Sequence, residues 1–479
     1  MQSAHPRRWL ALAVIATAQM MLILDASIVA VALPDIQADL GFAPDSLSWV
    51  FNAYVIAFGG LLLLGGRLSD LLGAKRMFTL GWTILAAGSL AAGLADSAGL
   101  EIVARAAQGA GAALIAPSAL TLLMMIFGSD PKELTKAFAV YGAAAPIGGT
   151  LGVFLGGVIS EWASWPWIFY INIPVAIAVL ALTPSLMPSA PARRGSIDLL
   201  GALLATGGLA LTVFGVVRAP EEGWGSAATL LAIGGGLALL AAFVAVQASR
   251  REPLMRLRIL RMPNLAAANI AQVLLGGAWI PMWFFLSLYL QQVLDLGAFE
   301  TGAALLPMTL AIALLMIVVA PRVIARAGIK TPIVAGMLIL AAGMVVLSLV
   351  RPDGSFLVDV LPGSLIAAAG MSLAFIPSLG TAIQSAKPEE GGLASGLVNT
   401  SYQVGSALGL AAMTAVATSQ GADQLANAAA LTDGYSAAFL GAAGIAVVGA
   451  LLAAMLLRVP KAPAAVQESP AEDRELVAA

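Results

Sequence analysis

Residues 10–33 read LALAVIATAQMMLILDASIVAVAL, an apolar run whose only ionisable side chain is Asp25. A membrane-spanning helix needs about 20 apolar residues, so this run is long enough to cross a bilayer. The rest of the chain has the same character. Its 479 residues are 60% hydrophobic and 10% charged, with a mean hydropathy of +0.94. Soluble domains carry about 25% charged residues. The composition therefore excludes a soluble fold and predicts an all-α polytopic membrane protein.

Apolar runs separated by polar breaks predict fourteen membrane spans in this sequence. They lie at about 10–33, 47–66, 78–95, 99–126, 137–159, 167–186, 199–217, 227–248, 265–292, 301–321, 332–350, 357–384, 392–418 and 435–457.

Lys and Arg residues give the orientation of these spans, because cytoplasmic loops of membrane proteins are enriched in both. With the N-terminus inside, all but three of the 24 Lys and Arg residues fall in cytoplasmic segments. The exceptions are Arg218 and Arg351, in outer loops, and Arg105, inside a span. We therefore expect an even number of helices, with both termini in the cytoplasm.

Two loops of the chain resemble each other and indicate an internal repeat. Arg67, Gly73 and Lys75 of the loop after the second span match Arg322, Gly328 and Lys330 of the loop after the tenth. This predicts a six-helix N-terminal bundle at 1–186, two inserted helices with flanking cytoplasmic loops at 187–263, a six-helix C-terminal bundle at 264–457 and a disordered cytoplasmic tail at 458–479. Paired bundles with a binding site between them are a common plan of transporters.

Several classes of chemistry lack the residues that they require. The chain has no Cys, and its only His is His5, so we expect no metal site and no cofactor. No phosphate-binding loop of an ATPase occurs. An intramembrane enzyme would need a metal, a Ser/His pair or paired acids, and a sensor would need a large soluble module. The sequence offers neither, so we expect no enzyme.

Asp25 and Arg105 are the two charges that lie deep inside the predicted spans, whereas Glu101 is expected at the interface. A charge at the bilayer centre costs about 2.5–3.5 kcal/mol, so it usually has a function. At 1.5 Å per helical residue, Asp25 lies about 12 Å and Arg105 about 9 Å below the outer helix ends. They share a layer and would form a pair or share a water cavity.

The functional hypothesis for this pair is proton coupling. Burial disfavours a charged carboxylate, and a nearby Arg favours it, so a change of conformation or substrate would load and unload a proton on Asp25. In the structural alternatives, Arg105 anchors to backbone carbonyls and Asp25 serves as a structural partner or helix cap.

Four motifs resemble the major facilitator superfamily, in particular its fourteen-helix drug:proton antiporters. Residues 24–34 are similar to the family's helix-1 signature, with Ser27 and Ala30 in place of the usual Thr and Asn. The other three matches are the loop 2–3 motif at 66–76, the helix-4 motif R-x-x-Q-G-x-G-A-A at 105–113, and a helix-6 motif at 165–174.

The resemblance implies conformational roles for residues of loop 2–3. Gly66 and Gly73 would let helices approach closely. Asp70 would link the inner ends of the two halves, through a helix N-terminus or a basic side chain, and hold the outward-facing state. Lys75 and Arg76 complete the motif.

The helix-5 motif of these antiporters reads G-P-x-x-G-G, and here the sequence departs from it. Gly152 and Gly156 are in place, but Val153 stands where Pro is expected. Because Pro removes an intrahelical hydrogen bond and allows a kink, we expect the bend to have moved to Pro146. This motif is associated with antiport in the family, and Val153 is the position at which the chain departs from it.

Aromatic, Met and amide side chains on four spans suit large, apolar compounds, cationic ones included. Aromatic residues of 265–292 extend over about three turns, so only the face of Trp279, Trp283 and Gln272 would reach one cavity. The candidate substrate-binding residues are Gln19, Met21, Asn52, Gln108, Trp279, Trp283, Asn399 and Gln403.

Together these features predict a proton-coupled antiporter that exports hydrophobic drugs or secondary metabolites by alternating access. The alternatives are an exporter of lipid or siderophore-like molecules and a proton-coupled importer. High Ala content and an excess of Arg over Lys are typical of a GC-rich bacterial genome. We therefore expect the protein to lie in the bacterial cytoplasmic membrane. We also expect a monomer. Its expected partners are a small hydrophobic substrate, protons and lipid, with no nucleic acid.

Overall fold

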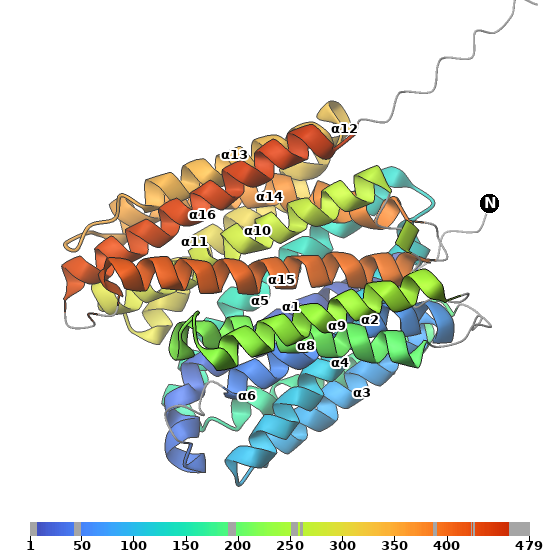
Figure 1. Cartoon of the computed structure of the whole chain (residues 1–479), viewed down its shortest axis with the longest axis horizontal. Helices are drawn as coiled ribbons and strands as arrows, with labels where there is room; N and C mark the ends of the chain where they lie inside the picture. The colour runs from blue at the N-terminus through green and yellow to red at the C-terminus, as the bar shows by residue number, and fades with distance from the viewer. Residues whose placement is uncertain are drawn as a thin grey trace, which may run out of the picture.

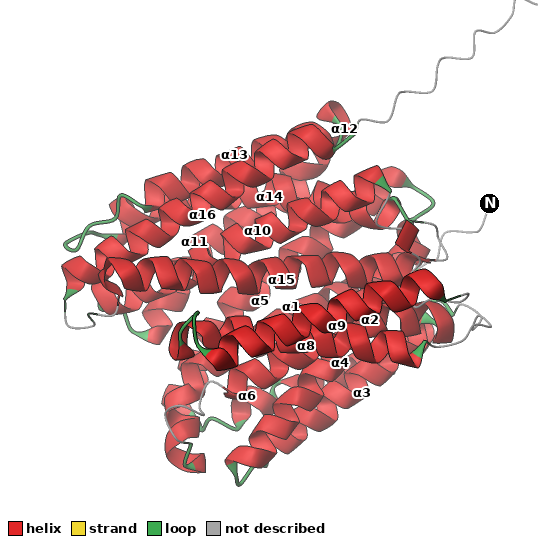
Figure 2. Cartoon of the chain, in the orientation of Figure 1, coloured by secondary structure: helices red, strands yellow, loops and turns green. Residues whose placement is uncertain are grey.

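The computed structural model describes residues 7–42, 49–189, 198–250, 257–258, 262–386, 390–422, 424 and 427–458. Within these ranges the chain forms helices joined by short loops and turns, with no strand (Figure 2). Eleven helices among the described residues are long and apolar enough to cross a membrane. The predicted all-α membrane architecture is confirmed, and the count of fourteen spans stays a prediction.

Between residues 7 and 186, the described part of the chain forms seven helices (Figure 1). They are α1 (Arg8–Leu40), α2 (Trp49–Leu72), α3 (Ala74–Gly93), α4 (Ala98–Phe127), α5 (Pro131–Trp162), α6 (Trp167–Tyr170) and α7 (Asn172–Leu186).

Two helices follow, α8 (Leu199–Glu222) and α9 (Ala227–Ser249), and they pack against each other as a hairpin. The last part of the chain contains α-helices that adjoin π-helical turns. They are α10 (Pro263–Leu288), η2 (Tyr289–Val293), α11 (Ala298–Leu314), η3 (Leu315–Val319), α12 (Ala320–Ala327), α13 (Lys330–Leu347), η4 (Phe356–Val360), α14 (Leu361–Gln384), α15 (Gly391–Ala417), η6 (Thr418–Ala422) and α16 (Ala428–Leu456).

Helix starts follow ordinary capping chemistry. The Asp130 carboxylate accepts the backbone N–H groups of Lys132 and Glu133 at the start of α5, and Pro131 occupies the first helical position. Asn427 caps α16 in the same way. These polar residues satisfy backbone donors that the first helical turn leaves without intrahelical partners.

Gly73 and Gly328, the matched glycines of the two repeated loops, both have positive φ, at 97° and 70°. Gly73 separates α2 from α3, and Gly328 follows the end of α12. Glycine adopts this conformation without the steric cost that a side chain would bring. The two loops therefore share a backbone feature as well as sequence positions.

The helices of the two halves form two groups that lie side by side (Figure 1). In the first group, α1 packs along α5, and α2 and α3 pack along α4. In the second group, α13 packs on α14, while α10 packs on α15 and α16. The groups meet where α2 contacts α15 and α5 contacts α11, and the α8–α9 hairpin packs on α2 and α15 through α8. The predicted domain boundaries remain a prediction.

Helices α1 and α5 touch almost backbone to backbone. A Cβ atom at Gly148 would clash with the carbonyl oxygen of Met20, and one at Gly152 would lie 2.7 Å from the Cβ of Ser27. Small residues allow such close approach between helices in a membrane. This contact fixes the position of α1, which carries Asp25, against α5.

Candidate functional site

Asp25 of α1 and Arg105 of α4 form an ion pair in the protein interior. The Nη1 atom of Arg105 lies 2.6 Å from Oδ2 of Asp25, and both side chains are 0% exposed. Two oppositely charged groups offset much of each other's desolvation cost only when further hydrogen bonds satisfy their remaining polar atoms.

Neutral polar side chains from three helices supply hydrogen bonds to this pair. Gln108 donates from Nε2 to Oδ1 of Asp25 at 3.1 Å and accepts from Nη1 of Arg105 at 2.7 Å. Asn172 of α7 donates to the same Asp25 oxygen at 2.6 Å. Ser89 of α3 accepts from Gln108 at 2.7 Å and from Asn172 at 3.2 Å. We call these five residues the buried polar network.

Arg105 is also held by backbone and by aromatic rings. Its Nε donates to the carbonyl oxygen of Val50 at 2.9 Å. The guanidinium lies 4.6 Å from the ring centroid of Tyr54 and 5.8 Å from that of Phe169, within the range of cation–π attraction. The Tyr54 hydroxyl in turn donates to the carbonyl oxygen of Leu22 in α1. These contacts enclose the charge on the side away from Asp25.

Glu101 is buried between helices as well. Its expected place at the membrane interface stays a prediction. Its side chain is 0% exposed. It precedes Arg105 by four residues, so the two share a face of α4 that turns toward the other helices. Among the described residues neither carboxyl oxygen has a hydrogen-bond partner, and the same holds for Nη2 of Arg105.

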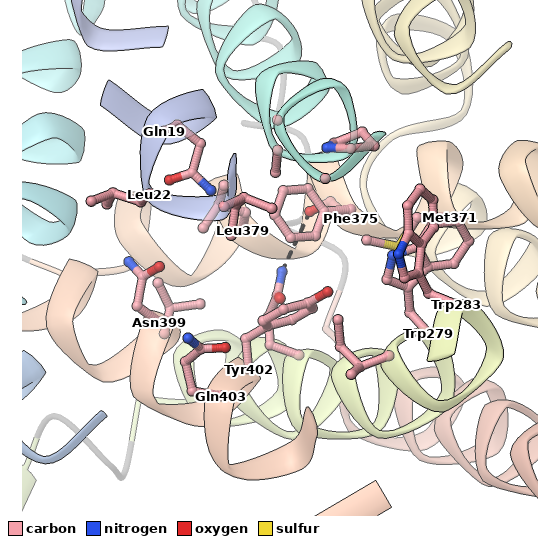
Figure 3. A pocket seen from close by; sticks show the side chains of 18 of the residues that line it. Gln19, Leu22, Trp279, Trp283, Met371, Phe375, Leu379, Asn399, Tyr402 and Gln403 are labelled. Carbon is pink, nitrogen blue, oxygen red and sulfur yellow. Dashed lines mark hydrogen bonds between the residues drawn. The ribbon is translucent and has the colours of Figure 1, made fainter. Parts of the chain in front are cut away.

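A cavity of about 170 Å³ lies between the two groups of helices (Figure 3). It is lined by α1, α2 and α5 from one group and by α10, η3, α14 and α15 from the other. Among the described residues that line it, none carries a charge. Its walls therefore offer shape, aromatic surface and neutral hydrogen-bonding groups, and no charge from the described lining.

Amide groups gather at one end of the cavity, where Gln19, Asn399 and Gln403 lie near one another (Figure 3). The Gln19 carbonyl accepts a hydrogen bond from the Tyr141 hydroxyl at 2.7 Å. The Asn399 amide nitrogen donates to the carbonyl oxygen of Ser395, one turn back along α15. The remaining polar atoms of these amides are available to a bound molecule.

Aromatic side chains form the other end. Trp279 and Trp283, one turn apart on α10, have ring centroids 6.4 Å apart, and Met371 of α14 lies beside them (Figure 3). Phe375 of α14 meets Tyr402 of α15 edge to face, with 5.9 Å between the ring centroids. This end provides polarizable surface for an apolar or aromatic group.

The structure brings five of the eight candidate substrate-binding residues to this cavity and leaves three outside its lining. Gln19, Trp279, Trp283, Asn399 and Gln403 line it, as does Gln272. Met21 and Asn52 are buried elsewhere, and Gln108 belongs to the buried polar network.

Helix α1 separates the cavity from the network. Ile23 and Ser27 face the cavity, whereas Asp25, between them in the sequence, faces α4 and α7. Helix α1 therefore contributes residues to both the candidate proton site and the cavity, but from different faces.

Asp70, near the end of α2, contacts the first turn of α15 across the boundary between the two groups. Its Oδ1 accepts the backbone N–H of Gly392 at 2.7 Å, and its Oδ2 accepts that of Leu393 at 2.9 Å. A helix N-terminus favours a carboxylate through its free N–H groups and its dipole. Gly66, one turn earlier, leaves room for the Gly392 backbone.

The other residues of this loop motif have separate surroundings. The Lys75 ammonium donates to the carbonyl oxygens of Pro184 at 2.8 Å and Met187 at 3.1 Å, where α7 ends. Arg76 is exposed. Lys75 thus links the start of α3 to the end of α7. Asp70 contacts the first turn of α15, so the two residues of this motif have different neighbours.

In α5, Pro146 lines the cavity inside an otherwise continuous helix. Gly152 packs on α1, and Gly156 is buried. The proline leaves the carbonyl group of Gly142, which also lines the cavity, without its intrahelical N–H donor.

Sequence reasoning missed part of the site. Asn172 stands inside the helix-6 motif at 165–174, but the sequence pattern indicates no role for it or for Ser89. Met371 and Phe375 carry no polar signature that would separate them from lipid-facing residues. The four-residue spacing of Glu101 and Arg105 was a signal that would have placed Glu101 in the interior.

A bundle of membrane-crossing helices in two groups, with a neutral cavity between them and a buried ion pair beside it, defines a secondary transporter rather than an enzyme. The sequence agrees with this class. Residues 15–410 match the family model of the Major Facilitator Superfamily. The chain belongs to this superfamily, and the relatives described next support its drug:proton antiporter family, so the predicted membership is confirmed.

Curated relatives align along nearly the whole chain. The cephamycin export protein CmcT of Amycolatopsis lactamdurans is 39% identical over 468 residues, covering 96% of this chain and 95% of the relative. The puromycin resistance protein pur8 of Streptomyces alboniger is 37% identical over 472 residues, covering 95% and 92%. Such relatives and the apolar helices make this chain a multi-pass protein of the bacterial cytoplasmic membrane.

A solved structure shows the same fold. The human organic anion transporter MFSD10 superposes with a TM-score of 0.68, covering 94% of this chain and all of the other, at 17% sequence identity.

Proposed function

We propose that this protein is a proton-coupled antiporter that exports hydrophobic drugs or secondary metabolites by alternating access. The observation that carries the proposal is the buried Asp25–Arg105 ion pair beside a cavity whose described lining is neutral. Relatives named for cephamycin export and puromycin resistance support export of antibiotic-like compounds.

The proposed topology follows from the charge distribution of the loops. We propose fourteen spans with both termini in the cytoplasm, arranged as bundles at 1–186 and 264–457, with the two helices of 187–263 inserted between them. A monomer suffices, because both groups of helices that line the cavity belong to one chain.

In the proposed mechanism Asp25 carries the exchanged proton and Arg105 stabilises its ionised form. Protonation of Asp25 removes the ion pair and leaves Arg105 with Gln108, Val50 and the two aromatic rings. An interior cation that loses its counter-ion is costly, so protonation favours rearrangement of α1 relative to α4. A shift of α1 reaches the cavity because Ile23 and Ser27 line it.

Substrate binding requires a second conformation. Ligand sites for drug-sized molecules measure about 300–1,000 Å³, larger than the present cavity. The contact of Asp70 with α15 would hold one end of the molecule closed, and its release would let the two helix groups separate. Gly66, Gly73, Pro146, Gly152 and Gly156 are proposed to permit this motion.

Inverted membrane vesicles with an imposed acid interior test the proposal. Ethidium and puromycin serve as probes, and uptake into the vesicles measures export. We expect the wild type to accumulate at least one probe only when the gradient is present, and Asp25→Asn to abolish this accumulation. Glu222→Gln, which alters an exposed pair with Arg218, is the matched control. Gradient-driven uptake by Asp25→Asn at the wild-type rate would show that Asp25 does not carry the proton.

A further inference from the structure

Glu101 is a buried carboxyl group that the mechanism above does not use. It lies in the first turn of α4, fully buried, and no described residue forms a hydrogen bond with either of its carboxyl oxygens. A buried ionised carboxylate without hydrogen bonds costs several kcal/mol. Such a group persists in an apolar interior only if it holds a proton or has a use in another conformation.

The charges around Glu101 allow one carboxylate at a time. Arg105, on the same helix, is the cation of this interior, and Asp25 on α1 is its bound partner. Tyr54 on α2 contacts Arg105 through its ring, and α3 and α7 contribute the neutral groups of Ser89 and Asn172 to the buried polar network. One cation balances one anion, so a second ionised carboxyl would leave a net negative charge out of water. Glu101 is therefore protonated while Asp25 is ionised.

The geometry gives Arg105 access to both acids. Residues four apart on a helix have Cβ atoms about 5–6 Å apart, and Glu followed by a basic residue at this spacing is the favourable order. Nη1 of Arg105 contacts Asp25, while Nη2 has no partner among the described residues. The guanidinium therefore has a donor free for Glu101 while it remains bonded to Asp25.

We propose that Glu101 is a second proton-carrying group of the same site, which exchanges with Asp25 as the partner of Arg105. In the exchange the O–H bond of Glu101 breaks and an O–H bond of Asp25 forms. The ion pair moves from Asp25 to Glu101, and the net charge of the interior is unchanged. Under the proposed topology the first turn of α4 lies toward the outer surface, so Glu101 receives the external proton first. The inference rests on the proposed proton coupling.

Infrared spectroscopy tests the protonation state directly. The purified, reconstituted wild type at pH 7 should show the C=O stretching band of a neutral carboxyl group. We expect Glu101→Gln to remove this band and Glu101→Asp to shift it, whereas the control Glu222→Gln should retain it. A Glu101→Gln spectrum that keeps the whole wild-type band would overturn the proposal.

Transport in the inverted vesicles supplies the second readout. We expect Glu101→Gln to lower gradient-driven uptake about a hundredfold, the lower end of what a positioned proton-transfer group contributes. Glu101→Asp, which keeps the acid, should restore part of the rate and move its pH profile.

The outcomes separate the two proposals. If Asp25→Asn is inactive but Glu101→Gln matches the wild type in rate and pH profile, the role of Glu101 is overturned and the proposed function stands. If the wild type shows no gradient-driven uptake of any probe, both proposals fail.

Discussion

The buried polar network and the cavity lie on opposite sides of α1, and their chemistry differs. The network pairs opposite charges at 2.6 Å with both side chains fully buried. The cavity, by contrast, is lined by aromatic, Met and amide groups, with no charged side chain among its described residues. Under the proposed function, the network would bind protons through charge, and the cavity would bind organic molecules through apolar contact and neutral hydrogen bonds.

This difference indicates that substrate and proton do not compete for the same atoms. A substrate in the cavity cannot contact Asp25 directly, because the carboxylate is fully buried against α4 and α7. Under the proposed mechanism, coupling would therefore pass through the position of α1 and its neighbours. Mutations in the network should change gradient-driven uptake, whereas mutations in the cavity should mainly change the KM for substrate.

The largest effect is expected from Arg105→Lys. A Lys ammonium cannot reach the Val50 carbonyl, Asp25 and Gln108 together, as the planar guanidinium does. Because the ammonium loses some of these charge-assisted hydrogen bonds, each worth about 1.5–3 kcal/mol, we expect gradient-driven uptake to fall about a hundredfold. Uptake into inverted vesicles measures the rate, and thermal unfolding of the purified protein measures the stability.

A charge-neutral double variant separates transport from folding in this case. Asp25→Asn combined with Arg105→Gln removes both charges, and we expect it to be more stable than Arg105→Gln alone while remaining inactive. Near-wild-type uptake by Arg105→Lys would argue that the network needs only a positive charge.

Asp70→Asn should have the next largest effect, because it acts on the boundary of the two helix groups rather than on either site. Replacing the carboxylate weakens two charge-assisted hydrogen bonds to α15, each worth about 1.5–3 kcal/mol. We expect transport to slow about tenfold or more. Spin labels near the ends of α2 and α15 should report a longer or broader distance distribution.

The matched control for this variant is Arg326→Gln, an exposed substitution in the corresponding loop of the second half. An unchanged distance distribution in Asp70→Asn would remove the basis for assigning Asp70 to conformational control.

Trp283→Ala should weaken substrate binding without removing the response to the pH gradient. The indole ring supplies part of the aromatic end of the cavity, and loss of such a buried contact costs about 1–2 kcal/mol. We expect the KM for ethidium to rise about tenfold, with a smaller change in kcat. Phe284→Ala, at the adjacent, outward-facing position, should leave the KM near the wild-type value. Equal changes in KM for both substitutions would contradict the assignment of Trp283 to the aromatic end of the cavity.

The smallest effect is expected from Asn399→Asp, which places an acid in the neutral cavity. It should favour a cationic probe over a neutral one by about fivefold, since an ion pair in a partly hydrated site is worth about 1 kcal/mol. The ratio of KM values for ethidium and a neutral dye measures this change. Asn427→Asp, at the N-cap of α16, serves as the control. An unaltered ratio would mean that substrates do not approach Asn399.

The helical fold could be predicted because apolar length is a direct physical requirement of the bilayer. The run at 10–33 gave the first helix, but α1 continues through Pro34 to Leu40 and ends at Gly41, which has positive φ. Hydropathy locates the part of a helix that lies in lipid and does not detect polar turns that extend beyond it.

The site was predictable where burial of charge singled out a residue. Asp25 and Arg105 are the charged residues deep in their predicted spans. Their distances from the outer helix ends alone predict that they lie at a similar depth in the membrane. Gln108 was assigned to substrate although it lies three residues after Arg105, on the same helical face. Glu101 lies in the first turn of α4, and hydropathy does not show that its side chain is buried between helices. Which face of a helix meets which neighbour depends on packing, and that information is not local in sequence.

The close contact of α1 with α5 has a mechanical consequence. At Gly148 the two backbones meet with no side chain between them, and at Gly152 only the short Ser27 side chain intervenes. No long, flexible side chain at these positions can absorb a displacement of one helix relative to the other. If α1 moves by an ångström when Asp25 changes its charge, Pro146 and Gly149 in the cavity wall must move with it. The two helices then move as one rigid unit, so that a change of charge at Asp25 changes the shape of the cavity wall.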